Sequence, residues 1–287
     1  MTRQVQSIVQ SPRLPRINRR KRAVAMVIGM TAFLILIVTI SMLIGDSQLT
    51  TNLSNRNMQP SLLHPFGTDW LGRDMFTRTM KGLTLSIGVG MLAAICSACI
   101  ATVVGLSAAL LGKGVDRFLS WLIDLFLSVP HLVTLILIAF ITGGGVKGVL
   151  IGVALTHWPS LSRIIRAEVL QLRAAEYVQV SRRLGKSNWW IATRHLLPHL
   201  VPQLLVGVLL LFPHAILHEA SITFLGLGLS PHQPAIGIIL SESMRYLSTG
   251  MWWLAVFPGL GLLVVVRMFD RLGDRLRTLI DPRHVND

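Results

Sequence analysis

Long apolar segments without charge recur along this chain, and they constrain its fold more than any other feature. Residues 23–45 and residues 83–112 contain no Asp, Glu, Lys or Arg. A helix needs about 20 such residues to cross a hydrocarbon core about 30 Å thick. Both segments exceed that length, so we expect an all-α membrane protein.

Composition agrees with this expectation. Hydrophobic residues make up 52% of the chain and charged residues 14%, and the mean hydropathy is +0.61. The formal net charge of +14 could indicate a nucleic-acid partner. The basic residues lie between apolar segments rather than on one soluble face, which argues against nucleic acid and for a membrane protein.

Six transmembrane helices are predicted, and the charge distribution decides their number. The first comprises residues 23–45. The others are residues 83–112, 118–146 with an interruption at Asp124, Pro130 and His131, 148–162 with a continuation through Leu172, 195–218 with proline kinks, and 246–266. Residues 220–241 are apolar, but their glycines and prolines favour an irregular, outward-facing segment. With six spans both termini are cytoplasmic, and 21 of the 27 basic residues lie inside, whereas a seventh span would place the arginine-rich C-terminus outside.

The predicted organisation has five parts. They are a basic cytoplasmic tail (1–22), a first transmembrane helix (23–45), an external loop (46–81), a core (82–280) with a cytoplasmic loop at 174–198, and a C-terminal tail (281–287).

The loop at residues 174–198, called the docking loop below, is polar and basic but is not composed like a linker. Its arginines and Lys186 would each cost roughly 2.5–3.5 kcal/mol in the bilayer core. Its apolar residues recur near helical spacing, and Gly185 lies where one helix could end and another begin. This pattern predicts two short amphipathic helices that dock a soluble partner. A solvated basic loop is the alternative.

The docking loop resembles the signature loop of ABC-importer permeases, which reads Glu-Ala-Ala, three residues, Gly, nine residues, Ile, one residue, Leu-Pro. Gln179, Val180 and Ser181 take the Glu-Ala-Ala positions and His195 takes the Ile position, with the spacing kept. In that family the loop docks in a groove of the ATPase subunit. The resemblance implies a coupling role for Gln179, Ser181, Arg182, Leu184, Gly185, Lys186, Leu197 and Pro198.

A second run narrows the resemblance. Residues 64–76 are similar to the His-Pro-x-Gly-Thr-Asp-x-x-Gly-Arg-Asp-x-Phe segment of the C-type permease of peptide and nickel importers, and further matches extend to Pro282. The resemblance implies an inner-membrane subunit that works by alternating access. Its partners would be a second related permease, two ATPase subunits that hold ATP and Mg²⁺, and an extracytoplasmic binding protein. We expect no enzyme activity and no cofactor on this chain, because Gly185-Lys186-Ser187 lacks the earlier glycine of a phosphate loop.

Ionisable residues at membrane depth are candidates for the translocation path, because such groups usually face a cavity or a partner. They are Asp124, His131, His157, His214, His218 and Glu219. Asp124 lies two turns after Arg117, so a packing or ion-pair role is the alternative there. His214 and His218 are four residues apart on one helix face, which suits either a divalent metal or interhelical hydrogen bonds.

The cargo stays open at this point. Peptides are the commonest cargo of the family, while residues 154–158 and the histidine pair resemble nickel-type members. The cargo is therefore nickel or a metal chelate, with a slight preference, or a di- or oligopeptide. A secondary transporter or channel, or a membrane scaffold, is the alternative function. A secondary transporter should show an inverted repeat, and none is visible in the sequence.

Overall fold

Helices dominate the part of the chain that the computed structural model describes, residues 19–280. The helices are α1 (Arg19–Leu43), α2 (Met75–Leu110), α3 (Lys113–Ser128), α4 (His131–Ile141), α5 (Gly145–Leu172), α6 (Glu176–Arg183), α7 (Asn188–Ile191), α8 (Leu197–Phe224), α9 (Ile236–Leu247) and α10 (Trp253–Ile280), with two short 3₁₀ turns (Asp46–Leu49 and Leu53–Asn55) and a π-helical turn (Ala192–Leu196). The prediction of an all-α membrane protein is confirmed. The predicted tails, residues 1–22 and 281–287, lie mostly or wholly outside the described residues.

Among the described residues, five helical stretches are long and apolar enough to cross a membrane, and there are six if a bent pair of helices is counted as one span. The five stretches are Lys21–Leu43, Met75–Leu110, Gly145–Leu172, Asn188–Phe224 and Trp253–Leu279. The pair consists of α3 and α4, which meet at an angle of 97°. The expected span over residues 118–146, with its interruption at Pro130, corresponds to this bent pair. Pro130 stands at the break as the residue before α4, where it lacks an N–H for a continuous helix.

The long helix α2 forms the centre of the bundle. It begins where the Asp74 carboxylate accepts a hydrogen bond from the Thr77 N–H at 2.8 Å, as a helix cap does. Helix α5 packs along it, and the Ser162 hydroxyl of α5 donates to the Ala101 carbonyl of α2 at 3.1 Å. Small buried residues on α2, such as Ala93 and Ala101, let the helices approach closely.

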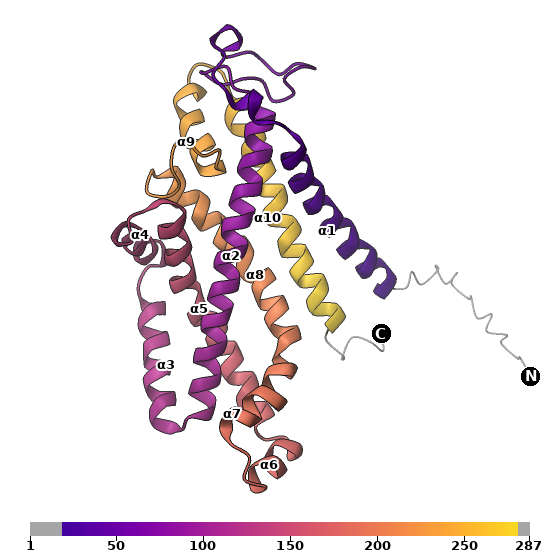
Figure 1. The fold of residues 1–287 in the computed structure, drawn as a ribbon, viewed down its shortest axis with the longest axis vertical. Helices are drawn as coiled ribbons and strands as arrows, with labels where there is room; N and C mark the ends of the chain where they lie inside the picture. The colour runs from indigo at the N-terminus through magenta and orange to yellow at the C-terminus, as the bar shows by residue number, and fades with distance from the viewer. Residues whose placement is uncertain (1–18, 281–287) are drawn as a thin grey trace, which may run out of the picture.

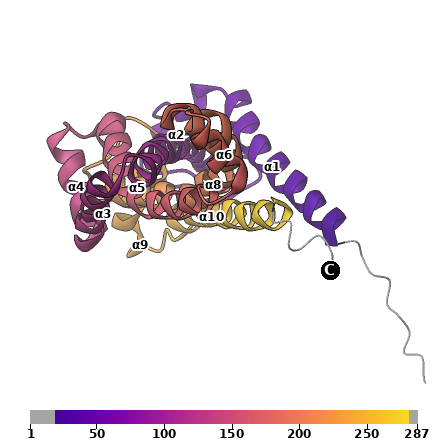
Figure 2. The same cartoon turned by 90° about the horizontal axis from the view of Figure 1, so that it is seen from below.

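The remaining helices pack around α2, and different helices form the two sides of the bundle. Helix α8 packs against α2 and α10, whereas α1 lies at one edge against α10 and α2. Figures 1 and 2 both place α1 on one side of the molecule and α3 with α4 on the other.

The two ends of the bundle carry different structures. The loop before α2 and helix α9 lie at one end, and α6 and α7 lie at the other (Figure 1). The loop is compact because Asn52 N–H donates to the Leu71 carbonyl at 2.9 Å. Gly72, with φ +74°, lies so close to this contact that a Cβ there would be 1.8 Å from the Asn52 oxygen. No other residue type fits this turn.

Two predicted boundaries shift in the structure. Helix α8 continues to Phe224 and α9 begins at Ile236, so the expected irregular segment over residues 220–241 is reduced to the connection between them. The last span begins at Trp253 rather than at Tyr246, because Tyr246 belongs to α9 and Gly250 turns the chain with φ +84°.

Candidate functional site

The docking loop has the geometry that its sequence predicts. Helix α6 ends at Arg183, Gly185 adopts φ +74°, and α7 begins after Ser187. The Ser187 hydroxyl accepts a hydrogen bond from the Trp190 N–H at 3.2 Å and so caps α7. The left-handed backbone at Gly185 is the reason that a glycine is needed there. A Cβ at Gly185 would meet no atom within 4 Å, so the constraint comes from the backbone and not from crowding in this chain.

The docking loop exposes large apolar side chains at the end of the molecule. Leu184 is 72% exposed and Trp189 is 79% exposed, and Tyr177 and Val180 are also exposed. Exposed basic residues lie near them along the chain, namely Arg182, Arg183, Lys186 and Arg194. An exposed apolar surface with basic neighbours suits a protein partner better than it suits water.

The docking loop is attached to the end of α2 by two hydrogen bonds, one from the residue just before it and one from its middle. The Arg173 guanidinium donates to the Ala109 carbonyl, and the Asn188 amide donates to the Leu110 carbonyl at 3.2 Å. These carbonyls belong to the last turn of α2, where a helix leaves its acceptors unpaired and favours a cation. Burial, and then the neighbouring Arg182, lower the pKa of Arg173, but an arginine stays charged at physiological pH.

The other predicted coupling residues lie in or beside this loop. The Gln179 amide donates to the Ala174 carbonyl at 3.0 Å, and Lys186 Nζ lies 5.2 Å from the centroid of the Trp190 ring. Leu197 and Pro198 form the start of α8, with Leu197 half-buried and Pro198 exposed.

Three of the predicted translocation-path residues come together from three helices. They are His131 at the start of α4, His157 in α5 and His218 in α8. The ring centroids are 4.4 Å apart for His131 and His157, 4.7 Å for His131 and His218, and 5.1 Å for His157 and His218. Sequence reasoning selected each residue but could not bring the three together.

The other three predicted path residues have separate environments. His214 is exposed one turn before His218 and is not a member of the three-histidine group. Glu219 is completely buried and accepts a hydrogen bond from the Thr223 hydroxyl at 3.1 Å. Asp124 pairs with Arg163 of α5 at 2.5 Å, an ion pair between two helices.

An ion-pair network at the opposite end was not predicted from the sequence. Arg78, which is 3% exposed, binds Asp69 at 2.7 Å and Glu242 at 2.8 Å. Arg73 also binds Asp69, at 2.7 Å. The network joins the loop before α2, α2 itself and α9. No local pattern indicates it, because Arg78 and Glu242 are 164 residues apart.

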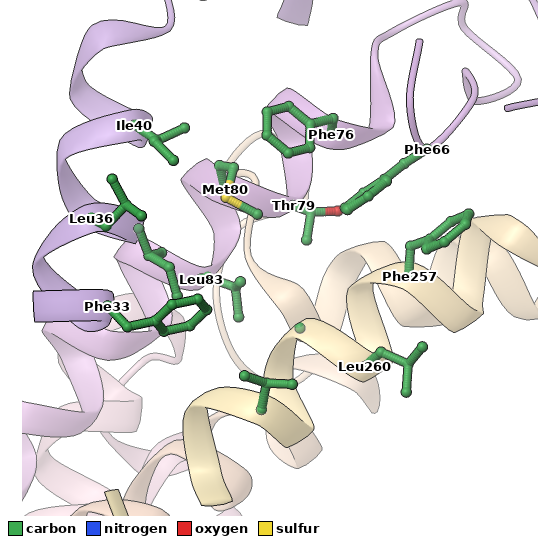
Figure 3. Close-up of a pocket in the computed structure, with 13 residues that line it drawn as sticks. Phe33, Leu36, Ile40, Phe66, Phe76, Thr79, Met80, Leu83, Phe257 and Leu260 are labelled. Carbon is green, nitrogen blue, oxygen red and sulfur yellow. The ribbon is translucent and has the colours of Figure 1, made fainter. Parts of the chain in front are cut away.

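A cavity of about 320 Å³ lies between α1, α2 and α10 (Figure 3). Figure 3 shows Phe33 of α1, Met80 of α2 and Leu260 of α10 facing this space. Its lining is apolar apart from the Thr79 hydroxyl and includes none of the predicted site residues. A hydrocarbon chain suits such a lining better than a polar cargo does.

Comparison with known proteins supplies the family. A relative described as the dipeptide transport system permease protein DppC of Alkalihalophilus pseudofirmus is 34% identical over 267 residues, which covers 93% of this chain and 88% of that protein. The DppC protein of Bacillus subtilis is 31% identical, with 93% and 84% covered. A solved structure of the MetNI methionine ABC transporter in an inward facing conformation shares the fold, with a TM-score of 0.58 and 17% identity, over 72% of this chain and 98% of that chain.

The model of the family described as "binding-protein-dependent transport system inner membrane component" matches residues 101–283, which include the docking loop and the histidine group. This chain is therefore a multi-pass inner-membrane protein and belongs to that family of ABC-importer permease subunits.

Proposed function

We propose that this chain is the permease subunit of an ATP-driven peptide importer and forms half of its translocation path. The observation that carries the proposal is the exposed surface of α6 and α7 at one end of the helices. The described part of the chain supplies apolar helices and an exposed apolar surface with basic neighbours. Active transport by such a chain needs an energy source from a partner that binds this surface. An ATPase subunit that binds ATP and Mg²⁺ fills that role in this family.

Peptides are the proposed cargo. The relatives compared above are named for dipeptides, and they cover nearly the whole of this chain. The expected preference for nickel or a metal chelate has no support from these relatives. The remaining partners are a second related permease, which supplies the other half of the path, two ATPase subunits and an extracytoplasmic binding protein that delivers the peptide.

The proposed orientation places both termini and the docking loop in the cytoplasm. The excess of Lys and Arg on that side supports it, since cytoplasmic segments of membrane proteins are enriched in these residues. The compact external loop and α9 then face the binding protein. ATP-driven closure of the ATPase subunits would move the docking loop and open the path alternately to the two sides.

The test is uptake by proteoliposomes that contain this chain, its partner permease and the ATPase subunits. The binding protein is added in solution on the side of the membrane that the permease's external face contacts. We expect uptake of a labelled dipeptide that requires ATP and the binding protein. Nickel uptake is measured in parallel. Uptake of nickel without peptide would overturn the proposed cargo, and uptake by this chain without ATPase subunits would overturn the importer mechanism.

A further inference from the structure

The three-histidine group of α4, α5 and α8 has the features of a metal site. One ring nitrogen from each of His131, His157 and His218 lies within 4.8 Å of the other two. Zinc binds imidazole nitrogen at about 2.0–2.1 Å, which places the ligand nitrogens of a tetrahedral site about 3.3 Å apart. Side-chain movements of about 1 Å would therefore bring the three nitrogens to metal-binding distance.

Hydrogen bonding fixes the orientation of one ring. Nδ1 of His157 lies 2.9 Å from the Val153 carbonyl oxygen, which can only accept, so Nδ1 carries the proton and donates. Nε2 of the same neutral ring then presents a lone pair. Histidine ligands of metals almost always donate their second ring nitrogen to a carbonyl or carboxylate in this way.

Two ring nitrogens of this group have no hydrogen-bond partner in the part of the chain that the structure describes. His157 is 7% exposed, and its Nε2 is buried without a hydrogen-bond partner among the described residues. The same holds for Nε2 of His131. Buried polar atoms are nearly always paired, so two unpaired ring nitrogens within one cluster of histidines indicate a missing ligand.

We propose that His131, His157 and His218 bind a divalent transition-metal ion such as Zn²⁺ or Co²⁺. Imidazole suits these ions and does not suit Mg²⁺ or Ca²⁺, which prefer oxygen ligands. Three protein ligands leave the fourth tetrahedral position for water or another small donor. The site differs from the His214 and His218 pair that the sequence suggests, because a single helix offers only two ligands and His214 stands outside the group. The proposal does not depend on peptides being the cargo.

The test measures metal binding by the assembled transporter in detergent, purified through a tag without histidine and stripped with a chelator. Zn²⁺ binding is measured by equilibrium dialysis with elemental analysis. Binding of Co²⁺ is followed by its visible absorption, which reports a tetrahedral nitrogen site. Neither readout needs transport activity.

The informative variant is His157→Asn, because its amide can still donate to the Val153 carbonyl while the ligand nitrogen is lost. His218→Gln serves as a second variant if assembly of the first is impaired, since His218 is only half-buried. The matched control is His232→Gln in the exposed connection before α9.

We expect the wild type and the His232 variant to bind the same number of ions. The His157 and His218 variants should each bind one ion fewer per copy of this chain, or bind it at least about tenfold more weakly, and lose the tetrahedral Co²⁺ absorption. Absence of tightly bound ion in the wild type would overturn the proposal, as would unchanged binding in an assembled His157 or His218 variant.

Discussion

The Ser181 hydroxyl of α6 lies 2.9 Å from Nε2 of His195 in the π-helical turn that follows α7. The same hydroxyl donates its proton to the Tyr177 carbonyl at 2.9 Å, so it accepts from His195, whose Nε2 carries a proton. The rings of Tyr177 and Trp190 meet the His195 ring edge-on, at 5.4 Å and 5.0 Å. These contacts hold the two short helices of the docking loop in one fixed arrangement.

This hydrogen bond should matter for coupling. Ser181→Ala and His195→Phe each remove it, and we expect either change to weaken activation of the ATPase subunits. The double variant should be little worse than each single one, with a coupling energy of about 0.5–1.5 kcal/mol. The measurement is the concentration of ATPase subunit that gives half-maximal activity with the reconstituted permeases. Additive effects of the two changes would show that the side chains act independently.

Replacement of Gly185 should uncouple the transporter. A β-branched residue at φ +74° costs of order 1–2 kcal/mol, so Gly185→Val should distort the turn between α6 and α7. We expect loss of both transport and ATP hydrolysis stimulated by the loaded binding protein. Membrane insertion and binding-protein affinity should stay near the wild-type values.

Gly185→Asn is the control for this experiment. Asparagine tolerates the left-handed region, and a Cβ at this position has open space within the chain. It should keep most of the stimulation. Full stimulation in the valine variant would mean that the loop is only a solvated connector.

The buried ion pairs of Arg78 should stabilise the end of the bundle that carries α9. Arg78→Met leaves Asp69 with Arg73 alone and leaves Glu242 without its shorter contact, so we expect destabilisation of about 3 kcal/mol. Lys81→Met is the control, because its partner Asp46 is 81% exposed and such pairs contribute about 1 kcal/mol or less. The thermal midpoint of the purified complex distinguishes them. Equal midpoints would contradict a stabilising role for the network.

The proposed orientation can be tested by reporter insertion. After Asp287, a reporter that is active only in the cytoplasm should give a signal. Near Asn55, a reporter that is active only outside the cytoplasm should give a signal. The physical reason is the excess of basic residues in the segments assigned to the inside. An external C-terminus would contradict the six-span arrangement.

The sequence was sufficient for features that depend on neighbouring residues. Uncharged length predicted α1 and α2, and the position of Gly185 predicted the turn between α6 and α7. Helix boundaries near glycine and proline were less certain, because a turn at Gly250 or a break at Pro130 also depends on what the flanking helices pack against.

Features that join distant segments could not be predicted. His214 and His218 attracted notice because helical periodicity is visible in a sequence, whereas His131, His157 and His218 meet only after three helices have packed. The same reason hid the contact of Arg78 with Glu242 and the contacts of Arg173 and Asn188 with the end of α2. Each requires knowledge of which helix lies beside which.

Helix α2 connects the two ends of the molecule, because both of its ends are hydrogen-bonded to neighbouring segments. Its N-cap, Asp74, also binds His64 of the loop before α2 at 2.8 Å, and the carbonyls of its last turn accept hydrogen bonds from Arg173, just before the docking loop, and from Asn188 within it. A helix of 36 residues is about 54 Å long and resists compression along its axis. Displacement of the docking loop by a bound partner would therefore move α2 as a rigid body. The displacement would reach the other end of the helix, where Asp74 holds the loop before α2.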